Sequence, residues 1–183
     1  MQILDKLRKD HQQMKQLLMI MEAEVRRFIS GERLDGELFS SVLEYLNRRV
    51  LINHHQVEDR MFELAMKRGA ISSGNRHNIP LEHEKIGFLS GALEDAISKV
   101  EQDNELPRIW LMSVAQEYIQ AQRRHMREEE LILFPACARG LLEEDWRAVN
   151  ETMISRKEDY QVVEDELEEM RRDVIAWHQE VHA

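Results

Sequence analysis

The sequence contains few of the residues that form disulfides, tight turns and irregular loops. Among its 183 residues there are one cysteine, three prolines and seven glycines. The single cysteine, Cys137, excludes an internal disulfide and a CxxC site, and it favours a reducing compartment. The scarcity of glycine and proline, together with 33% charged residues, is typical of a helical globular protein, so we expect mostly helix.

The sequence also lacks a basic run and a long apolar run. Its formal net charge is -10 and no cluster of Lys and Arg offers a phosphate-binding surface, so we expect no nucleic-acid partner. No stretch approaches the roughly 18 to 20 apolar residues that span a membrane, and the amino terminus lacks the apolar core of a signal peptide. These absences predict a cytoplasmic protein without a membrane partner.

Apolar residues recur every three or four positions through five segments, a spacing that predicts five helices. In the first segment the apolar seam runs from Leu4 to Phe28, and Ser30 with Gly31 ends the helix. The other helices are predicted over Leu38–Lys67, Asn78–Val100, Pro107–Ala136 and Leu142–Trp177.

The predicted fold class is all-α. Short connections between the first four helices favour an antiparallel up-down four-helix bundle over residues 1–138. The fifth helix contains neither glycine nor proline and would be on the order of 50 Å long, more than such a bundle needs. Residues 139–183 are therefore predicted to form a C-terminal extension that packs on the bundle or on the partner chain of a homodimer.

Each of the first four predicted helices carries a histidine on its apolar seam, and two of these histidines are followed four residues later by a glutamate. The residues are His11, His54 with Glu58, His83, and His125 with Glu129. Positions four apart lie one turn apart on the same helix face, so each pair presents an imidazole and a carboxylate to a common point. The seam thus predicts four nitrogen and two carboxylate donors that face inward.

This combination favours a metal centre. A lone seam histidine is usually a hydrogen-bonded core residue, and a helical glutamate is usually solvated. Burying four imidazoles and two carboxylates together without compensation would be costly, and two metal ions remove that cost. Nitrogen and carboxylate donors without thiolate suit two non-heme iron ions, with manganese or zinc as alternative occupants. If both glutamates bridge, each octahedral ion keeps about two positions for a further bridge and for water, O2 or NO.

Four sequence segments resemble the hemerythrin-like, or HHE cation-binding, domain. They are KDHQQMKQLL around His11, NHHQVEDRMF around His54 and Glu58, LEHEKI around His83, and HMREEELILFP around His125 and Glu129. The resemblance spans residues 1–138. It implies a four-helix bundle around a non-heme di-iron site that binds O2 or a related diatomic molecule, in a protein of oxygen carriage, sensing, iron handling or the response to nitric oxide and redox stress.

The sequence departs from the oxygen-carrying members of that family. Those members supply five histidines, two of them four residues apart on the third helix, whereas Ile79 and Gly87 stand four residues from His83 here. They also separate the last histidine and carboxylate by five residues, a spacing that would select Glu130. The symmetry of the two pairs favours Glu129 instead. The chain therefore resembles the bacterial HHE type, and reversible oxygen carriage is not implied.

Five residues near the predicted ligands have open roles. His55 and Asp59 lie about 100° around the helix from the predicted ligands His54 and Glu58. Their side chains are therefore expected to face a neighbouring helix or solvent, or to support a ligand from outside. His77 would reach the site only if its loop folds inward. Tyr118 and Gln122 share a helix face with the fourth seam histidine, so both are candidates for a hydrogen bond to a bound ligand. For Tyr118 the pattern favours core packing over that role, and for Gln122 solvation or a contact between helices is an equal alternative.

The sequence supports two functions. The first is the binding of O2 or NO for sensing, storage or a stress response, and the second is a di-iron redox enzyme that acts on O2, peroxide or NO. Iron storage or transfer is disfavoured, because ferritin-like sites use Glu-x-x-His at i, i+3, the opposite order and another spacing. No nucleophile triad, phosphate-binding glycine loop or redox cysteine pair is present, so no catalytic residue is assigned and enzyme activity stays open.

Overall fold

The computed structural model of the protein describes residues 2–50, 54–72, 78–101, 108–154 and 157–181. Within these ranges every regular element is helical and no residue lies in a β-strand, which confirms the predicted all-α class. No helix in the described part of the chain is both long enough and apolar enough to cross a bilayer.

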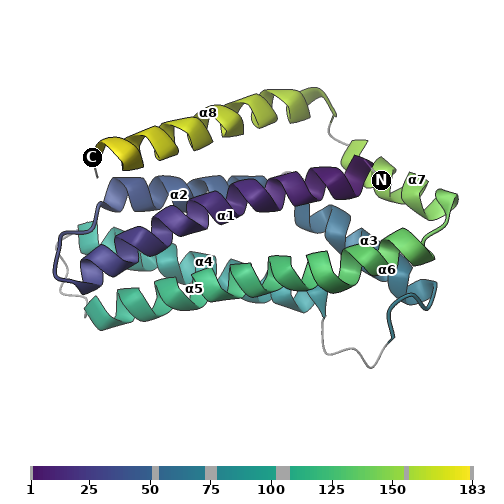
Figure 1. Cartoon of the computed structure of the whole chain (residues 1–183), viewed down its shortest axis with the longest axis horizontal. Coiled ribbons are helices and arrows are strands. Elements are labelled where there is room, and N and C mark those ends of the chain that lie inside the picture. Colours follow the sequence, from purple (N-terminus) through teal and green to yellow (C-terminus); the bar gives the residue numbers. More distant parts are fainter. Residues whose placement is uncertain (1, 51–53, 73–77, 102–107, 155–156, 182–183) are drawn as a thin grey trace.

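The helices that precede residue 141 lie along the long axis of the molecule, and the chain reverses direction between successive lengths of helix (Figure 1). The first length is α1 (Gln2–Ile29), and the second comprises α2 (Gly36–Arg49) and α3 (His55–Lys67). The third is α4 (Ile79–Glu101), and the fourth comprises α5 (Arg108–Glu128), η2 (Glu129–Leu133) and α6 (Phe134–Gly140). As predicted, α1 ends just before Gly31, whose φ of 98° suits a residue without a Cβ.

Two of the predicted helices are interrupted by wider, π-helical hydrogen bonding. Val50 and His54 have this pattern between α2 and α3, within the predicted helix Leu38–Lys67, and residues 51–53 lie outside the described ranges. In the fourth length, η2 lies between α5 and α6, and the Phe134 N–H bonds to the Glu129 carbonyl, five residues back. Periodicity alone did not predict these turns, because a single inserted residue barely changes an apolar pattern.

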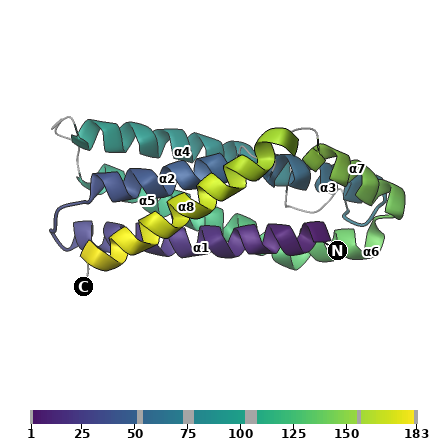
Figure 2. The same cartoon turned by 90° about the horizontal axis from the view of Figure 1, so that it is seen from above.

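The C-terminal region is not the single long helix predicted over Leu142–Trp177. It contains α7 (Glu143–Ile154), which packs on α3, and α8 (Lys157–Val181), which crosses α2 and α1 (Figures 1 and 2). Val149 of α7 lies in one apolar cluster, whereas Leu167 and Val174 of α8 lie in another. The prediction is wrong because the two apolar faces are buried against different parts of the protein.

These two apolar clusters divide the core along its length. The first cluster includes Met14, Leu18, Leu46, Ile86, Ala115, Met126 and Leu167, and the second includes Leu7, Val57, Ile79, Leu133, Phe134 and Val149. On every length of helix the chain passes from one cluster to the other: between Leu7 and Met14, Leu46 and Val57, Ile79 and Ile86, and Met126 and Leu133. The seam histidines of the first three lengths lie within these stretches, and on the fourth length His125 directly precedes Met126 while Glu129 lies within the stretch. The fold thus places one polar layer between two apolar ones.

Leu18→Ala should lower the free energy of unfolding by about 2–5 kcal/mol, because Leu18 is fully buried in the first cluster and its truncation leaves a cavity. The next residue, Met19, is 63% exposed, so Met19→Ala should change that free energy by less than about 0.5 kcal/mol. Urea unfolding of the metal-free protein measures both. Equal losses would contradict the assignment of Leu18 to the core.

Candidate metal centre

The six residues predicted as metal donors lie together in the polar layer. They are all buried: His11, His54, Glu58, His83, His125 and Glu129. They come from α1, the junction before α3, α3, α4, α5 and the start of η2. Their burial between two apolar clusters removes them from bulk water, so their charges need compensation within the protein.

Glu58 contacts histidines from three directions. Its Oε1 lies 3.2 Å from His54 Nε2 and 3.4 Å from His11 Nε2. Its Oε2 lies 3.6 Å from His83 Nε2. The two oxygens of one carboxylate thus face two different groups of imidazoles.

Glu129 faces the same centre from the fourth length of helix. Its Oε2 lies 3.3 Å from His125 Nε2 and 3.4 Å from His11 Nε2, and its Oε1 lies 3.9 Å from His83 Nε2. The Nε2 atoms of His83 and His125 are 3.1 Å apart. Two atoms that each bind one ion at about 2.1 Å lie roughly 3.0–3.4 Å apart, so most of these separations suit shared ions.

The donor atoms fall into two groups that share one residue. His11, His54 and Glu58 form one group, and Glu58 with His55, His83 and His125 forms the other, each with ligand atoms within 4.8 Å of one another. Both oxygens of Glu58, both oxygens of Glu129 and His11 Nε2 are buried without a hydrogen-bond partner. Orphaned carboxylate oxygens are costly, and bound cations would satisfy them, so the donor set fits metal ions.

Each of the four imidazoles also has a carboxylate next to its other nitrogen. The Nδ1 to oxygen distances are 2.9 Å for His11 to Glu130, 3.4 Å for His54 to Asp10, 2.8 Å for His83 to Asp59 and 3.1 Å for His125 to Glu82. For His11, His83 and His125 the carboxylate lies at hydrogen-bonding distance, which fixes the ring orientation and raises the basicity of Nε2, the usual support of a metal-binding histidine. His54 Nδ1 has the longer ion pair with Asp10 and no hydrogen-bond partner. Asp10 and Glu82 were not among the residues predicted near the site, although each directly precedes a seam histidine.

Glu129 and Glu130, at the start of the π-helical turn, have different surroundings. Glu129 faces the centre and is fully buried, whereas the side chain of Glu130 is 30% exposed and contacts His11 Nδ1 and Lys15. Hydrogen bonds from His11 and Lys15 lower the pKa of Glu130 to about 2. Consecutive glutamates therefore lie on opposite sides of one imidazole, and both stay beside His11.

His55 lies closer to the centre than its helical phase suggested. Its ring stacks on His83 with centroids 3.6 Å apart and planes 6° apart, and its buried Nε2 has no hydrogen-bond partner. Burial and the nearby His83 hold the pKa of His55 well below its ordinary value. An atom of His55 nevertheless lies within 4.8 Å of ligand atoms of Glu58, His83 and His125, so the structure brings His55 into the second donor group. His77 lies outside the described residues.

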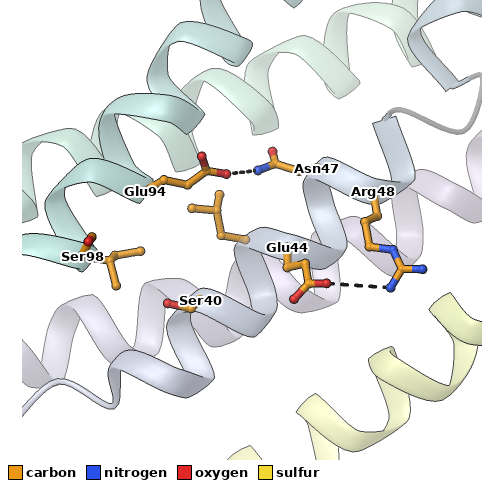
Figure 3. Close-up of a pocket in the computed structure, with 8 residues that line it drawn as sticks. Ser40, Glu44, Asn47, Arg48, Glu94 and Ser98 are labelled. Atoms are coloured by element: carbon orange, nitrogen blue, oxygen red, sulfur yellow. Dashed lines mark hydrogen bonds and ion pairs between the residues drawn. The ribbon is translucent and has the colours of Figure 1, made fainter. Parts of the chain in front are cut away.

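Tyr118 and Gln122 form a buried polar pair. Gln122 Nε2 donates to the Tyr118 hydroxyl over 3.1 Å, and burial raises the pKa of Tyr118. A separate groove of about 350 Å³ lies between α2 and α4, where Asn47 Nδ2 donates to Glu94 (Figure 3). Ser90 Oγ also donates to Asn47. Their described hydrogen bonds join them to each other and not to the six donor residues.

Charge interactions hold the metal-free centre in a protonated state. Burial alone would lower the pKa of His83, but its ion pairs with Asp59 and Glu58 raise it to about 9. Burial likewise opposes a charged His11, yet Glu129, Glu130 and Glu58 raise the pKa of His11 well above its ordinary value. Protons thus occupy positions that cations would take.

Comparison with known families gives a match over most of the chain. Residues 2–137 match the family model described as Hemerythrin HHE cation binding domain. A search of curated proteins and a search of solved structures gave no match. The matched range contains all six donor residues and the four outer carboxylates, and it ends before α7 and α8.

His54→Ala should abolish stoichiometric metal binding, whereas His55→Ala should retain most of it. The reason is that His54 Nε2 faces the orphaned Glu58 Oε1, while His55 is stacked on a ring whose Nε2 already faces the centre. Equilibrium dialysis against Zn²⁺, with metal counted per chain, measures both variants. Similar losses in the two variants would refute the assignment.

Zn²⁺ binding at pH 7.5 should release protons, because an imidazole with a pKa of about 9, as in His83, is mostly protonated there and binds metal only when neutral. The apparent affinity should therefore fall as the pH is lowered from 9 to 6. Isothermal titration calorimetry in two buffers of different ionisation enthalpy counts the protons. An observed enthalpy that is independent of the buffer would contradict this expectation.

Proposed function

Since this chain belongs to the hemerythrin HHE cation binding domain family, we propose that it holds two iron ions and binds O2 or NO at them. The observation that carries the proposal is the pair of donor groups that share Glu58, within a layer of four inward Nε2 atoms. His11 and His54 would hold one ion, and His83 and His125 the other. Glu58 and Glu129 would bridge them.

The donor chemistry supports iron. Imidazole nitrogen and carboxylate oxygen suit iron, manganese and zinc, whereas thiolate ligands are absent from the centre. The one cysteine, Cys137, is buried, its Sγ points to the Met61 carbonyl, and burial raises its thiol pKa to about 12. Manganese or zinc are therefore the alternative occupants that we propose.

Small ligands fit this centre better than large ones. If each ion were held by two of the four imidazoles and by Glu58 and Glu129, the protein would leave coordination positions free on it for a diatomic ligand or water. The apolar clusters on both sides exclude bulk water. When bound, the iron pair would supply reversible binding or electron transfer to O2 or NO, and the protein residues would hold the ions and orient the imidazoles.

The fold supports the same function. We propose that α1, α2 with α3, α4, and α5 with α6 are the four members of an antiparallel up-down bundle over residues 1–138. Residues 139–183 would then be an extension that packs on this bundle. A homodimer through the C-terminal helix and a cytoplasmic location remain proposals from the sequence.

A redox enzyme acting on O2, peroxide or NO is the second candidate. The observation that favours it is an oxidisable side chain on the same helix as His125: the buried phenol of Tyr118 lies two turns before His125 on α5, and its hydroxyl accepts a hydrogen bond from Gln122. Binding of O2 or NO requires only open coordination positions on the ions, whereas a redox enzyme also requires an external reductant.

Anaerobic reconstitution with Fe²⁺ should load two irons per chain into the wild type, and Glu58→Gln should lose at least one of them because it removes the shared charge. Glu63→Gln, on the same helix but with its side chain 66% exposed, is the matched control and should load normally. Metal analysis measures the loading.

The optical spectrum on exposure to O2 then separates the two candidates. A stable and reversible change supports binding, and rapid irreversible oxidation with turnover supports the enzyme. Failure of the wild type to bind stoichiometric iron would overturn both.

A further inference from the structure

A buried carboxylate connects the candidate metal centre to charges outside it. Asp10, 3% exposed, lies with Oδ2 3.4 Å from His54 Nδ1 and 3.2 Å from Lys6 Nζ. Its Oδ1 lies 3.4 Å from Arg49 Nη1. One carboxylate is therefore shared between a histidine of the centre and two permanent cations.

Glu164 of α8 contacts the same two cations. Arg49 Nη1 donates to Glu164 Oε1 over 2.7 Å, and Lys6 Nζ lies 3.3 Å from the same oxygen. Arg49 itself is 2% exposed, and its Nη2 donates to Gln13 and to the Tyr45 hydroxyl, both over 3.3 Å. These bonds hold the guanidinium in place between α1, α2 and α8, so it cannot turn to solvent when an acceptor is lost.

Glu164 supplies negative charge beside the two cations that contact Asp10. Loss of the Glu164 charge would leave Arg49 and Lys6 less neutralised, so their positive charge would act more strongly on Asp10. The negative charge of Asp10, 3.4 Å from His54 Nδ1, would then be more fully neutralised, and it would support a cation at His54 Nε2 less strongly. Because Arg49 is buried, solvent screens this effect less than it would at the surface.

We propose that Glu164 is a positioning residue of the metal centre, acting through Arg49, Lys6 and Asp10 on His54. This inference rests on the proposed metal-binding function and extends it to α8, which lies outside the matched range of residues 2–137. Since energetic coupling between two sites is reciprocal, metal binding also stabilises the docking of α8 on α1 and α2 by the same factor.

Glu166 provides a matched control on the same helix. It is an acidic residue two positions along α8 and also pairs with an arginine of α2, Arg48, but with its side chain 51% exposed. Glu164→Gln and Glu166→Gln remove the same charge from the same helix. They differ in that the structure joins Glu164 to Asp10 through shared cations.

The test is a chelator competition that measures Zn²⁺ affinity at pH 7.5 in the wild type and both variants, after circular dichroism shows that all three are folded. Glu164→Gln should weaken the affinity for one ion about three- to tenfold, less than the loss of a direct partner of a ligand. Glu166→Gln should change it less than about twofold. In the Asp10→Asn background, Glu164→Gln should have no more effect than Glu166→Gln, because the connecting carboxylate is already gone.

Hydrogen exchange provides a second readout that does not depend on the affinity measurement. Backbone amides of α8 should exchange more slowly in the Zn²⁺-loaded wild type than in the metal-free protein, and Glu164→Gln should reduce this difference. Equal affinities and equal exchange in the two glutamine variants would overturn the inference while leaving the proposed function intact. Failure of the wild type to bind Zn²⁺ would overturn both.

Discussion

The carboxylates of Glu58 and Glu129 impose the constraint on which the rest of the structure depends. All four of their oxygens are buried without a hydrogen-bond partner, between two apolar clusters. Anions in such a position require positive charge nearby, and the groups that face them are imidazoles. Protons on His11 and His83 supply that charge in the metal-free protein, and cations at the same place would supply it more fully.

The surrounding structure serves to orient those imidazoles. Four carboxylates contact the four Nδ1 atoms, and basic side chains such as Lys15 and Arg49 in turn neutralise some of these carboxylates. Imidazoles therefore surround the two central carboxylates, outer carboxylates contact the imidazoles, and basic side chains contact the outer carboxylates. The buried cation Arg49 contacts Asp10 on one side and Glu164 of α8 on the other, so α8 belongs to the same network of charges.

The two halves of the C-terminal region cover different parts of the core. α7 covers the second cluster beside α3, and α8 covers the first cluster across α2 and α1. The polar layer lies between the parts that they cover. The residues outside the family match therefore enclose the same core that the matched residues build, and their ion pairs reach it at Arg49 and Lys6.

The sequence by itself determined the helical class and the seam on which His11, His54, His83 and His125 lie, because helical spacing fixes which side chains share a face. It also predicted Glu58 and Glu129 as the inward carboxylates, and the structure brings their oxygens within 3.9 Å of imidazole nitrogens. Contacts between helices are not encoded in the spacing of any one helix. Only the tertiary structure could therefore decide that Asp10 supports His54, that Glu82 supports His125, that His55 stacks on His83, and that the predicted fifth helix is two helices on two clusters.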